Sequence, residues 1–494
     1  MGSSRGAESL ERGSLRPALG RRATRGLAVT LGGQWGRLVL QTLSTAVLAR
    51  LLLPGDFGLV AMVVAVTGLA EQVKDLGLAA ATVQRDKLED RQVTGLFWVN
   101  AALGTVLAAL VAACAPLVAA FYGRDELTGL TAVLALGFVA GGLSVQHAAL
   151  LQRRLRFGAL AVCETGSFAV GVVAAIAAAE AGAGYWALAV LPLTAGWTRA
   201  ALLWTFCRWR PGSPRRGAGI REMLSFGGGV STFNLLNYIS RNADNVLIGK
   251  VSGATSLGLY SRAYTLLLLP LQQLNGPLAS VAVPVLSILR AEPAKYRAFY
   301  RSAVGGLALV GMPLVVLLVV CAPEVVALLL GPGWDDAVPI FRALGLAGVV
   351  HVVGNTNGWI YVSWGSTGRM ARWALVSRPL MVASIAAGLP WGPLGVAVSY
   401  AVGQLVLAVP GFANAVRDTP LSLGDVGGAV WRPAVLAAAT GAAATGLQAL
   451  VDGPPLVVLL AVCLPAALTH AALTLAWRPT RESVRLVLAQ RGRR

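Results

Sequence analysis

The sequence predicts an all-α polytopic membrane protein with about fourteen transmembrane helices. Its composition is the first observation: 56% of the residues are hydrophobic, 13% are charged and the mean hydropathy is +0.68. A soluble domain carries roughly 25% charged residues. The second observation is a pattern of apolar stretches, each long enough to cross a bilayer, that recur along the whole chain between short connectors. We expect two six-helix lobes followed by two extra C-terminal helices.

The apolar stretches define the predicted spans. In chain order they cover residues 27–53, 59–76, 93–121, 130–151, 159–179, 185–206, 224–250, 257–289, 303–322, 340–364, 370–389, 395–409, 433–450 and 455–475. The first stretch is too long for the core of a signal peptide, so we expect it to stay as a membrane helix. No connector exceeds roughly 20 residues, which leaves no room for a folded extramembrane domain.

The connectors alternate in charge, and this alternation predicts the orientation of the chain. Those on one side are rich in arginine and lysine: Arg153, Arg154, Arg156, Arg208, Arg210, Arg215, Arg216, Arg221, Arg290, Lys295, Arg297 and Arg301. Those on the other side carry little beyond Arg124 and Lys250. Basic connectors stay in the cytoplasm, so both termini are predicted to be cytoplasmic. The net charge of +19 lies mostly in these connectors and in the tails, where it meets anionic lipid headgroups, so nucleic acid is not an expected partner.

A weak internal repeat predicts how the spans are grouped. Gly32-Gly33 opens the first span and Gly227-Gly228-Gly229 opens the seventh, and each span has a polar middle. Two six-helix halves would enter the membrane from the same side, as a parallel repeat. The predicted segments are a basic tail (1–26), an N-lobe (27–206), a basic linker (207–223), a C-lobe (224–416), two further helices (417–475) and a second basic tail (476–494).

Charged residues inside the predicted spans are the candidate functional residues, because burying one at the bilayer centre costs about 2.5–3.5 kcal/mol. Arg37 lies about ten residues into the first span, near mid-membrane. Gln34 and Gln41 lie on the same helical face, so a polar stripe runs along this helix. A stripe, unlike a single structural arginine, indicates a water-filled passage.

The seventh span has a matching polar face formed by Asn234, Asn237, Arg241 and Asp244. Arg241 and Asp244 have the spacing of a helical ion pair, and this pairing competes evenly with a substrate-binding role for Arg241.

The remaining charges near or inside the spans fall into two groups. Arg262 and Arg378 extend the cationic set, whereas Glu71, Lys74 and Asp75 form a mutually paired gate or ion-pair group at the end of the second span. Glu164 and Arg199, at similar depths on neighbouring helices, are also expected to pair. The deep charge is mainly cationic, which suits an anionic passenger because arginine binds phosphate with two parallel hydrogen bonds.

The sequence offers little support for catalysis. Asp335 and Asp336 follow a Gly-Pro-Gly turn on the outer side, and such an acidic pair could hold a metal and a sugar phosphate; a role at a helix N-terminus is favoured instead. The five cysteines and three histidines are scattered. We therefore expect no metal site, no cofactor and no enzymatic activity.

Several short segments resemble signatures of a known family. They are Leu51–Val60 (LLLPGDFGLV), Asp75–Leu78, Phe121–Gly123, Gln152–Phe157, Asn242–Gly249, Leu257–Tyr264 and Leu330–Trp334. Together, in order and at plausible spacing over roughly residues 30 to 375, they resemble the polysaccharide transporter family, the Wzx-type oligosaccharide flippases, of the superfamily that includes multidrug antiporters and lipid II flippases.

The resemblance implies two six-helix lobes around a central cavity in a bacterial plasma membrane. It implies that the passenger is a polyprenyl diphosphate-linked oligosaccharide, handled alongside polysaccharide polymerase and glycosyltransferases. Cationic cavities of relatives correspond here to Arg37, Arg241, Arg262 and Arg378 by helix and expected facing. Antiporters of the superfamily often carry an acid in the first helix, and residues 27–53 contain none.

Three other functions stay open from the sequence. They are a cation-coupled drug or metabolite antiporter, a lipid II flippase, and a membrane polymerase or glycosyltransferase. The first would show a deep acid early in the first helix, the second would be essential for growth, and the third needs catalytic residues on the outer side.

Overall fold

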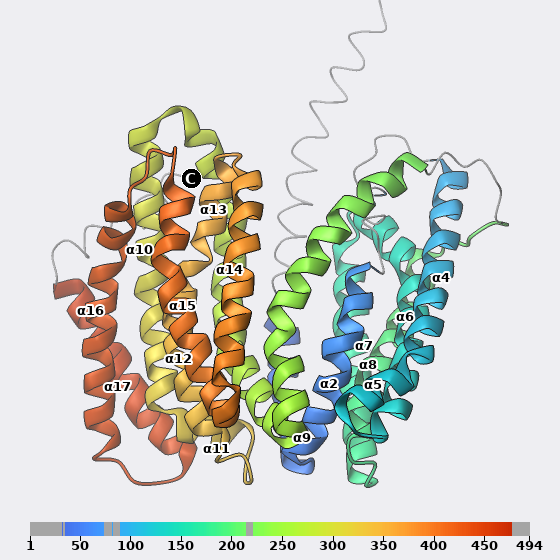
Figure 1. The fold of residues 1–494 in the computed structure, drawn as a ribbon, viewed down its shortest axis with the longest axis horizontal. Coiled ribbons are helices and arrows are strands. Elements are labelled where there is room, and N and C mark those ends of the chain that lie inside the picture. Colours follow the sequence, from blue (N-terminus) through green and yellow to red (C-terminus); the bar gives the residue numbers. More distant parts are fainter. Residues whose placement is uncertain (1–31, 33–34, 74–81, 83–88, 214–220, 477–494) are drawn as a thin grey trace, which may run out of the picture. The chain divides into compact units, whose positions relative to one another are not determined.

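The computed structural model describes residue 32, residues 35–73, residue 82, and residues 89–213 and 221–476. Throughout this part of the chain the regular structure is helical, as the apolar pattern predicts. The contacts divide the chain into two compact units, Met1–Asn242 and Ala243–Arg494. We describe each unit separately (Figure 1).

Unit 1 contains the helices that correspond to the first six predicted spans. They are a helix over 35–51, α2 (Pro54–Val73), α4 (Asp90–Ala113), α5 (Ala115–Tyr122), α6 (Glu126–Arg153), α7 (Phe157–Glu180) and α8 (Trp186–Cys207). The main packing is between α7 and α8 and between α4 and α6. Gly104 and Gly142 let the backbones of α4 and α6 approach closely, since a Cβ on either would collide with the other helix. Small residues have this role in many membrane helix pairs.

The boundary between the units falls inside α9 (Arg221–Ile288), which corresponds to two predicted spans. The backbone of α9 is not helical at Gly253, where φ is 84° and ψ is −179°. An L-amino acid rarely adopts such a positive φ, so glycine permits the break. The predicted spans 224–250 and 257–289 lie on either side of this residue.

Unit 2 contains the part of α9 from Ala243 onward and the helices that follow it, and closes with the two extra helices. After α9 come α10 (Pro293–Val320), α11 (Ala322–Leu329), α12 (Ala337–Gly354), α13 (Thr356–Ser363), α14 (Thr367–Gly388), α15 (Gly392–Val416), α16 (Leu423–Gln448) and α17 (Pro455–Ala476). The central packing is α10 on α16, α14 on α15 and α12 on α15, with α17 on α16 at the edge (Figure 1). Each of the fourteen predicted spans therefore corresponds to a helical segment.

The surfaces of these helices are those of a multi-pass membrane protein. Ten helical stretches of the described chain are long and apolar enough to cross a bilayer. On α17, Leu460, Leu464 and Leu468 are 51%, 59% and 71% exposed and lie on one face at helical spacing. A continuous apolar face of this kind would be unstable in water and is stable against acyl chains.

Candidate functional site

The candidate site in unit 1 is built around one carboxylate shared by two arginines. Arg37, on the helix over 35–51, donates from Nη1 to Glu164 Oε2 at 3.3 Å. Arg199, on α8, binds the other oxygen of the same carboxylate, with Nε and Nη2 at 2.8 Å and 2.7 Å from Oε1. The prediction that Glu164 and Arg199 pair is therefore confirmed. Three helices contribute to this cluster, which we call the Arg–Glu–Arg cluster.

The two arginines are held unequally. Arg199 makes two short contacts to Glu164, whereas Arg37 makes one longer contact. The guanidinium of Arg37 also lies over the ring of Phe168, 5.6 Å from its centroid. Because Phe168 is one turn after Glu164 on α7, the same helix face supplies both the acid and the aromatic surface that receive Arg37.

The charge balance of the cluster favours an anionic ligand. Two guanidinium groups face one carboxylate, which leaves an excess positive charge. The side chains of Arg37, Glu164 and Arg199 are 50%, 35% and 32% exposed, so a ligand can reach them. Within a membrane-spanning bundle, partly exposed charges are stable only where water or a polar ligand meets them.

The polar stripe predicted on the first helix is described only in part. Gln41, one turn after Arg37, is half-buried and its carbonyl accepts a hydrogen bond from Thr45. Gln34 lies outside the described residues. The side chain of Asn237 on α9 also lies outside them, whereas Arg241 is described and exposed.

The carboxylate of Asp244 has partners other than Arg241. It is only 4% exposed, and it accepts hydrogen bonds from the Tyr260 hydroxyl at 2.9 Å and from the Asn245 amide at 2.8 Å. The helical ion pair with Arg241 is not formed in the described part of the chain. A tyrosine can reach this buried acid because α9 returns past it after the break at Gly253.

Asp244 begins a chain of polar groups inside unit 2 that the sequence did not reveal. The rings of Tyr260 and Tyr264 stack at 6.1 Å, the hydroxyls of Tyr264 and Tyr400 are 3.4 Å apart, and Gln404 donates to Tyr400 at 2.8 Å. The spacing of Tyr260 and Tyr264, one turn apart, is the only local signal that could have indicated it. Tyr400 and Gln404 come from α15 and are brought in by tertiary packing.

The other predicted site residues are less informative. Arg262 and Arg378 are partly buried, and each has contacts with other parts of the protein. Glu71 is exposed near the end of α2 and is also engaged. Lys74 and Asp75 lie outside the described residues, so the predicted gate or ion-pair group stays a prediction.

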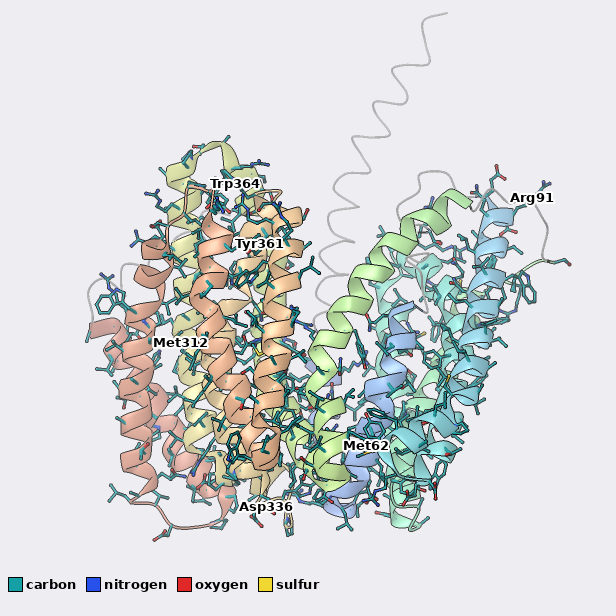
Figure 2. The ribbon with its side chains drawn as sticks, in the orientation of Figure 1. Met62, Arg91, Met312, Asp336, Tyr361 and Trp364 are labelled. Carbon is teal, nitrogen blue, oxygen red and sulfur yellow. The ribbon has the colours of Figure 1, made fainter. Side chains whose placement is uncertain are left out.

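The outer acidic pair lies at the start of α12. Asp336 occupies the predicted N-terminal position, but its side chain makes no capping hydrogen bond. Figure 2 places it at the end of unit 2 opposite to Trp364. In the described part of the chain no three His, Cys, Asp or Glu side chains are grouped as metal ligands.

Comparison with known proteins identifies the family. The profile of a family described as polysaccharide biosynthesis protein matches residues 47–339, more than half of the chain. The chain belongs to this family. It is 30% identical over 396 residues to the teichuronic acid biosynthesis protein TuaB of Bacillus subtilis, a match that covers 77% of this chain and 80% of TuaB.

Two other relatives are similar over half or more of the chain. The lipopolysaccharide biosynthesis protein WzxC of Escherichia coli is 24% identical, with 76% of this chain and 78% of WzxC covered. The succinoglycan biosynthesis transport protein ExoT of Rhizobium meliloti is 26% identical over 53% of each chain.

Solved structures show the same fold. The lipid II flippase MurJ in an inward closed conformation superimposes with a TM-score of 0.70 at 12% identity, covering 90% of this chain and 98% of MurJ. An inward-facing multidrug transporter of the MATE family gives a TM-score of 0.62 at 15% identity, covering 76% of this chain and 93% of that one. The chain therefore shares the fold of MurJ and of this MATE transporter.

Proposed function

We propose that this protein is a flippase that moves polyprenyl diphosphate-linked oligosaccharides from the inner to the outer leaflet of a bacterial plasma membrane. The observation that carries the proposal is the Arg–Glu–Arg cluster, an accessible site with excess positive charge inside a membrane-spanning bundle. A diphosphate is the part of such a substrate that most needs this environment, because it must leave water while the prenyl tail stays in lipid. The biosynthetic roles in the names of TuaB, WzxC and ExoT support this substrate class.

The geometry supports a specific sequence of contacts. Glu164 holds both arginines, and Arg37 is the more weakly held of the two. An entering diphosphate competes with Glu164 for Arg37, whose planar guanidinium can bind two phosphate oxygens. Arg199 stays on Glu164 and keeps the acid from repelling the ligand. When the diphosphate leaves, Glu164 takes Arg37 back, so Arg37 is again paired with an acid.

The fold supports alternating access as the mode of transport. Transporters built from two repeated bundles move one against the other around a fixed site. Both termini are cytoplasmic in this proposal, because the basic connectors define that side. Two classes of enzyme are the expected partners. Glycosyltransferases supply the lipid-linked unit, and polysaccharide polymerase consumes it. The transport reaction itself needs no catalytic residue.

The test is to locate lipid-linked saccharide by leaflet in a deletion strain. We expect it to accumulate on the inner leaflet and to reappear on the outer side after complementation with the wild-type chain. Accumulation on the outer leaflet would instead indicate a polymerase or glycosyltransferase. Loss of viability with arrest of peptidoglycan synthesis would indicate a lipid II flippase, and gradient-dependent drug efflux with normal surface polymer would indicate an antiporter.

A further inference from the structure

The two units repeat a distinctive helix break. In unit 1, Cys114 separates α4 from the eight-residue helix α5, which begins with Ala115-Pro116. In unit 2, Cys321 separates α10 from the eight-residue helix α11, which begins with Ala322-Pro323. Each short helix is followed by a glycine with positive φ. This correspondence makes the pair α7 and α8 of unit 1 equivalent to the pair α14 and α15 of unit 2.

At the basic end of each equivalent pair, an arginine from the start of one helix binds the end of the other. Arg156, just before α7, donates to the carbonyl of Phe206 in the last turn of α8 at 2.9 Å. Arg369, in the first turn of α14, donates to the carbonyl of Arg417 at the end of α15. Cations are favourable at helix C-termini, where carbonyls lack intrahelical partners.

Backbone strain also gathers at these two places. Among the described residues other than glycine, positive φ occurs only at Leu155, Arg208 and Asp418. Leu155 precedes Arg156, whereas Arg208 and Asp418 follow the last turns of α8 and α15. A strained backbone conformation persists only where the surrounding structure holds it in place, and such residues often gather at functional sites. At both sites the strained turn shapes the wall of a pocket.

Each unit has a pocket at this position. The pocket in unit 1 has a volume of about 430 Å³ and is lined by Arg156, Arg208, Thr205 and Phe206. The pocket in unit 2 has a volume of about 510 Å³ and is lined by Arg369, Arg372, Trp373, Val376, Asn414, Arg417 and Asp418. Both volumes are large enough for a phosphate-bearing headgroup.

The chemistry of the unit 2 pocket is that of an anion site. The Arg369 guanidinium is already engaged. It donates to Asp418 Oδ2 at 2.6 Å and to the carbonyl of Arg417 at the end of α15. Arg372 and Arg417 are exposed, and neither guanidinium forms an ion pair within the part of the chain that the structure describes. The Asn414 oxygen accepts from Tyr361 at 2.7 Å, so its amide N–H groups are left to serve as donors. Two cations and an amide donor therefore face the pocket.

An apolar surface continues from this pocket along α14. Val376 and Leu380 follow Arg372 at intervals of one turn on the same helical face, and each is 53% exposed. A free anion would make no contact with this apolar surface. The acyl chains of a lipid whose headgroup occupies the pocket would cover it. Basic pockets between helices on the cytoplasmic side bind anionic lipid headgroups in other membrane proteins.

We propose that the two equivalent pockets bind the phosphate of an anionic phospholipid of the inner leaflet, one lipid for each unit. Arg372 and Arg417 contact the phosphate in unit 2, and Arg208 does so in unit 1. Within unit 1 the pocket lies at the basic end of α7 and α8, about two helical turns along α8 from Arg199, so this site is additional to the Arg–Glu–Arg cluster proposed for the transported substrate.

The test measures lipid retention by the full-length protein. Wild-type protein is purified in nanodiscs of phosphatidylcholine with a minor fraction of phosphatidylglycerol, and co-purifying lipids are counted by native mass spectrometry. For the double variant Arg372→Gln and Arg417→Gln we expect occupancy of the unit 2 site to fall about tenfold, so that the count drops from two bound phosphatidylglycerols to one. The variant Arg372→Lys and Arg417→Lys keeps the charge but not the planar fork, so retention should be intermediate.

The matched control removes the same number of charges outside both pockets. Arg91→Gln and Lys295→Gln change exposed side chains in the two units and should leave retention unchanged. Equal loss in this control, or unchanged retention in the pocket variant, would overturn the proposal. The ligand is identified by adding geranyl diphosphate or inorganic phosphate as competitors. Binding of geranyl diphosphate without retention of phosphatidylglycerol would assign the pocket to the transported lipid and overturn the proposal. Because the measurement is lipid retention, its outcome does not depend on whether the chain translocates a saccharide.

Discussion

Arg37 Nη1 lies 3.3 Å from Glu164 Oε2, although 127 residues separate the two in the sequence. The contact joins the first helix of unit 1 to α7, and the same carboxylate binds Arg199 more closely. A carboxylate that holds one arginine tightly and another loosely can release the second to a competing anion. Substitution of Arg37 and substitution of Glu164 test this difference separately.

Replacing Arg37 removes the group that is proposed to transfer to the diphosphate. For Arg37→Gln we expect export of the lipid-linked saccharide to fall at least about tenfold, since a charge-assisted hydrogen bond contributes about 1.5–3 kcal/mol. The readout is surface polymer in a complemented deletion strain, normalised to the amount of protein in the membrane. Arg124→Gln, which removes an exposed arginine away from the cluster, is the control and should leave export intact. Normal export by Arg37→Gln would exclude Arg37 from the substrate site.

Replacing Glu164 should have the opposite effect on binding. In Glu164→Gln both arginines lose their acid, so the positive charge that faces an anion increases. We expect tighter binding of a soluble prenyl diphosphate, measured by its protection of the purified protein against thermal unfolding, together with slower export because the ligand is released less readily. Weaker binding by this variant would show that Glu164 helps to form the site and does not compete with the ligand.

Asp244 and Tyr260 should behave as a coupled pair in stability. Both side chains are buried, and an unpaired buried acceptor or donor costs about 1–3 kcal/mol. We therefore expect Tyr260→Phe and Asp244→Asn each to lower the thermal stability of the purified protein, and the double variant to lose less than the sum of the two. Additive losses would mean that the 2.9 Å hydrogen bond contributes little.

Gly68 of α2 packs against the ring and hydroxyl of Tyr238 of α9. The Tyr238 hydroxyl donates to the Val64 carbonyl at 2.8 Å. A Cβ at position 68 would collide with the tyrosine ring and hydroxyl. We expect Gly68→Ala to destabilise the protein by about 1–3 kcal/mol, and a second change, Tyr238→Leu, to recover part of the loss. Gly36→Ala is the control, because its Cβ would meet no neighbour within 4 Å.

The thiols of Cys321 and Cys463 are 3.9 Å apart, from the start of α11 and from α17. Treatment of membranes with copper phenanthroline should join them by a disulfide, detected as a cross-linked peptide after proteolysis. Cys463→Ser should abolish the cross-link, and Cys114→Ser should leave it. Absence of the cross-link in the wild-type protein would contradict this packing of α17 on unit 2.

The sequence predicted the helices because each apolar stretch must satisfy its backbone hydrogen bonds within itself in a membrane. Breaks inside helices were harder to predict. The apolar pattern continues across Cys114 and Cys321, where the structure interrupts the predicted spans 93–121 and 303–322. A proline after a short hydrophobic run marks each break, but many prolines in this chain, such as Pro313, lie inside continuous helices.

Part of the candidate site could also be predicted. Arg37 was identified because a charge in an apolar span is costly, and Glu164 and Arg199 were paired from their similar depth. The sequence could not show that all three meet, because depth along a helix says nothing about rotation around it or about which helices are neighbours. The same limit explains Asp244, for which helical spacing favoured Arg241 and packing supplied Tyr260.

By itself, the sequence determined that this is a multi-pass helical membrane protein, which stretches are helices, and which charges lie deep in them. These properties follow from local composition, because the bilayer acts on every residue through its polarity and its position along the chain. Tertiary structure alone decided the partners of each charge and brought Arg156 and Arg369 to the ends of α8 and α15. Such contacts join segments that are distant in sequence. They depend on how the helices pack against one another, and no single segment encodes that packing.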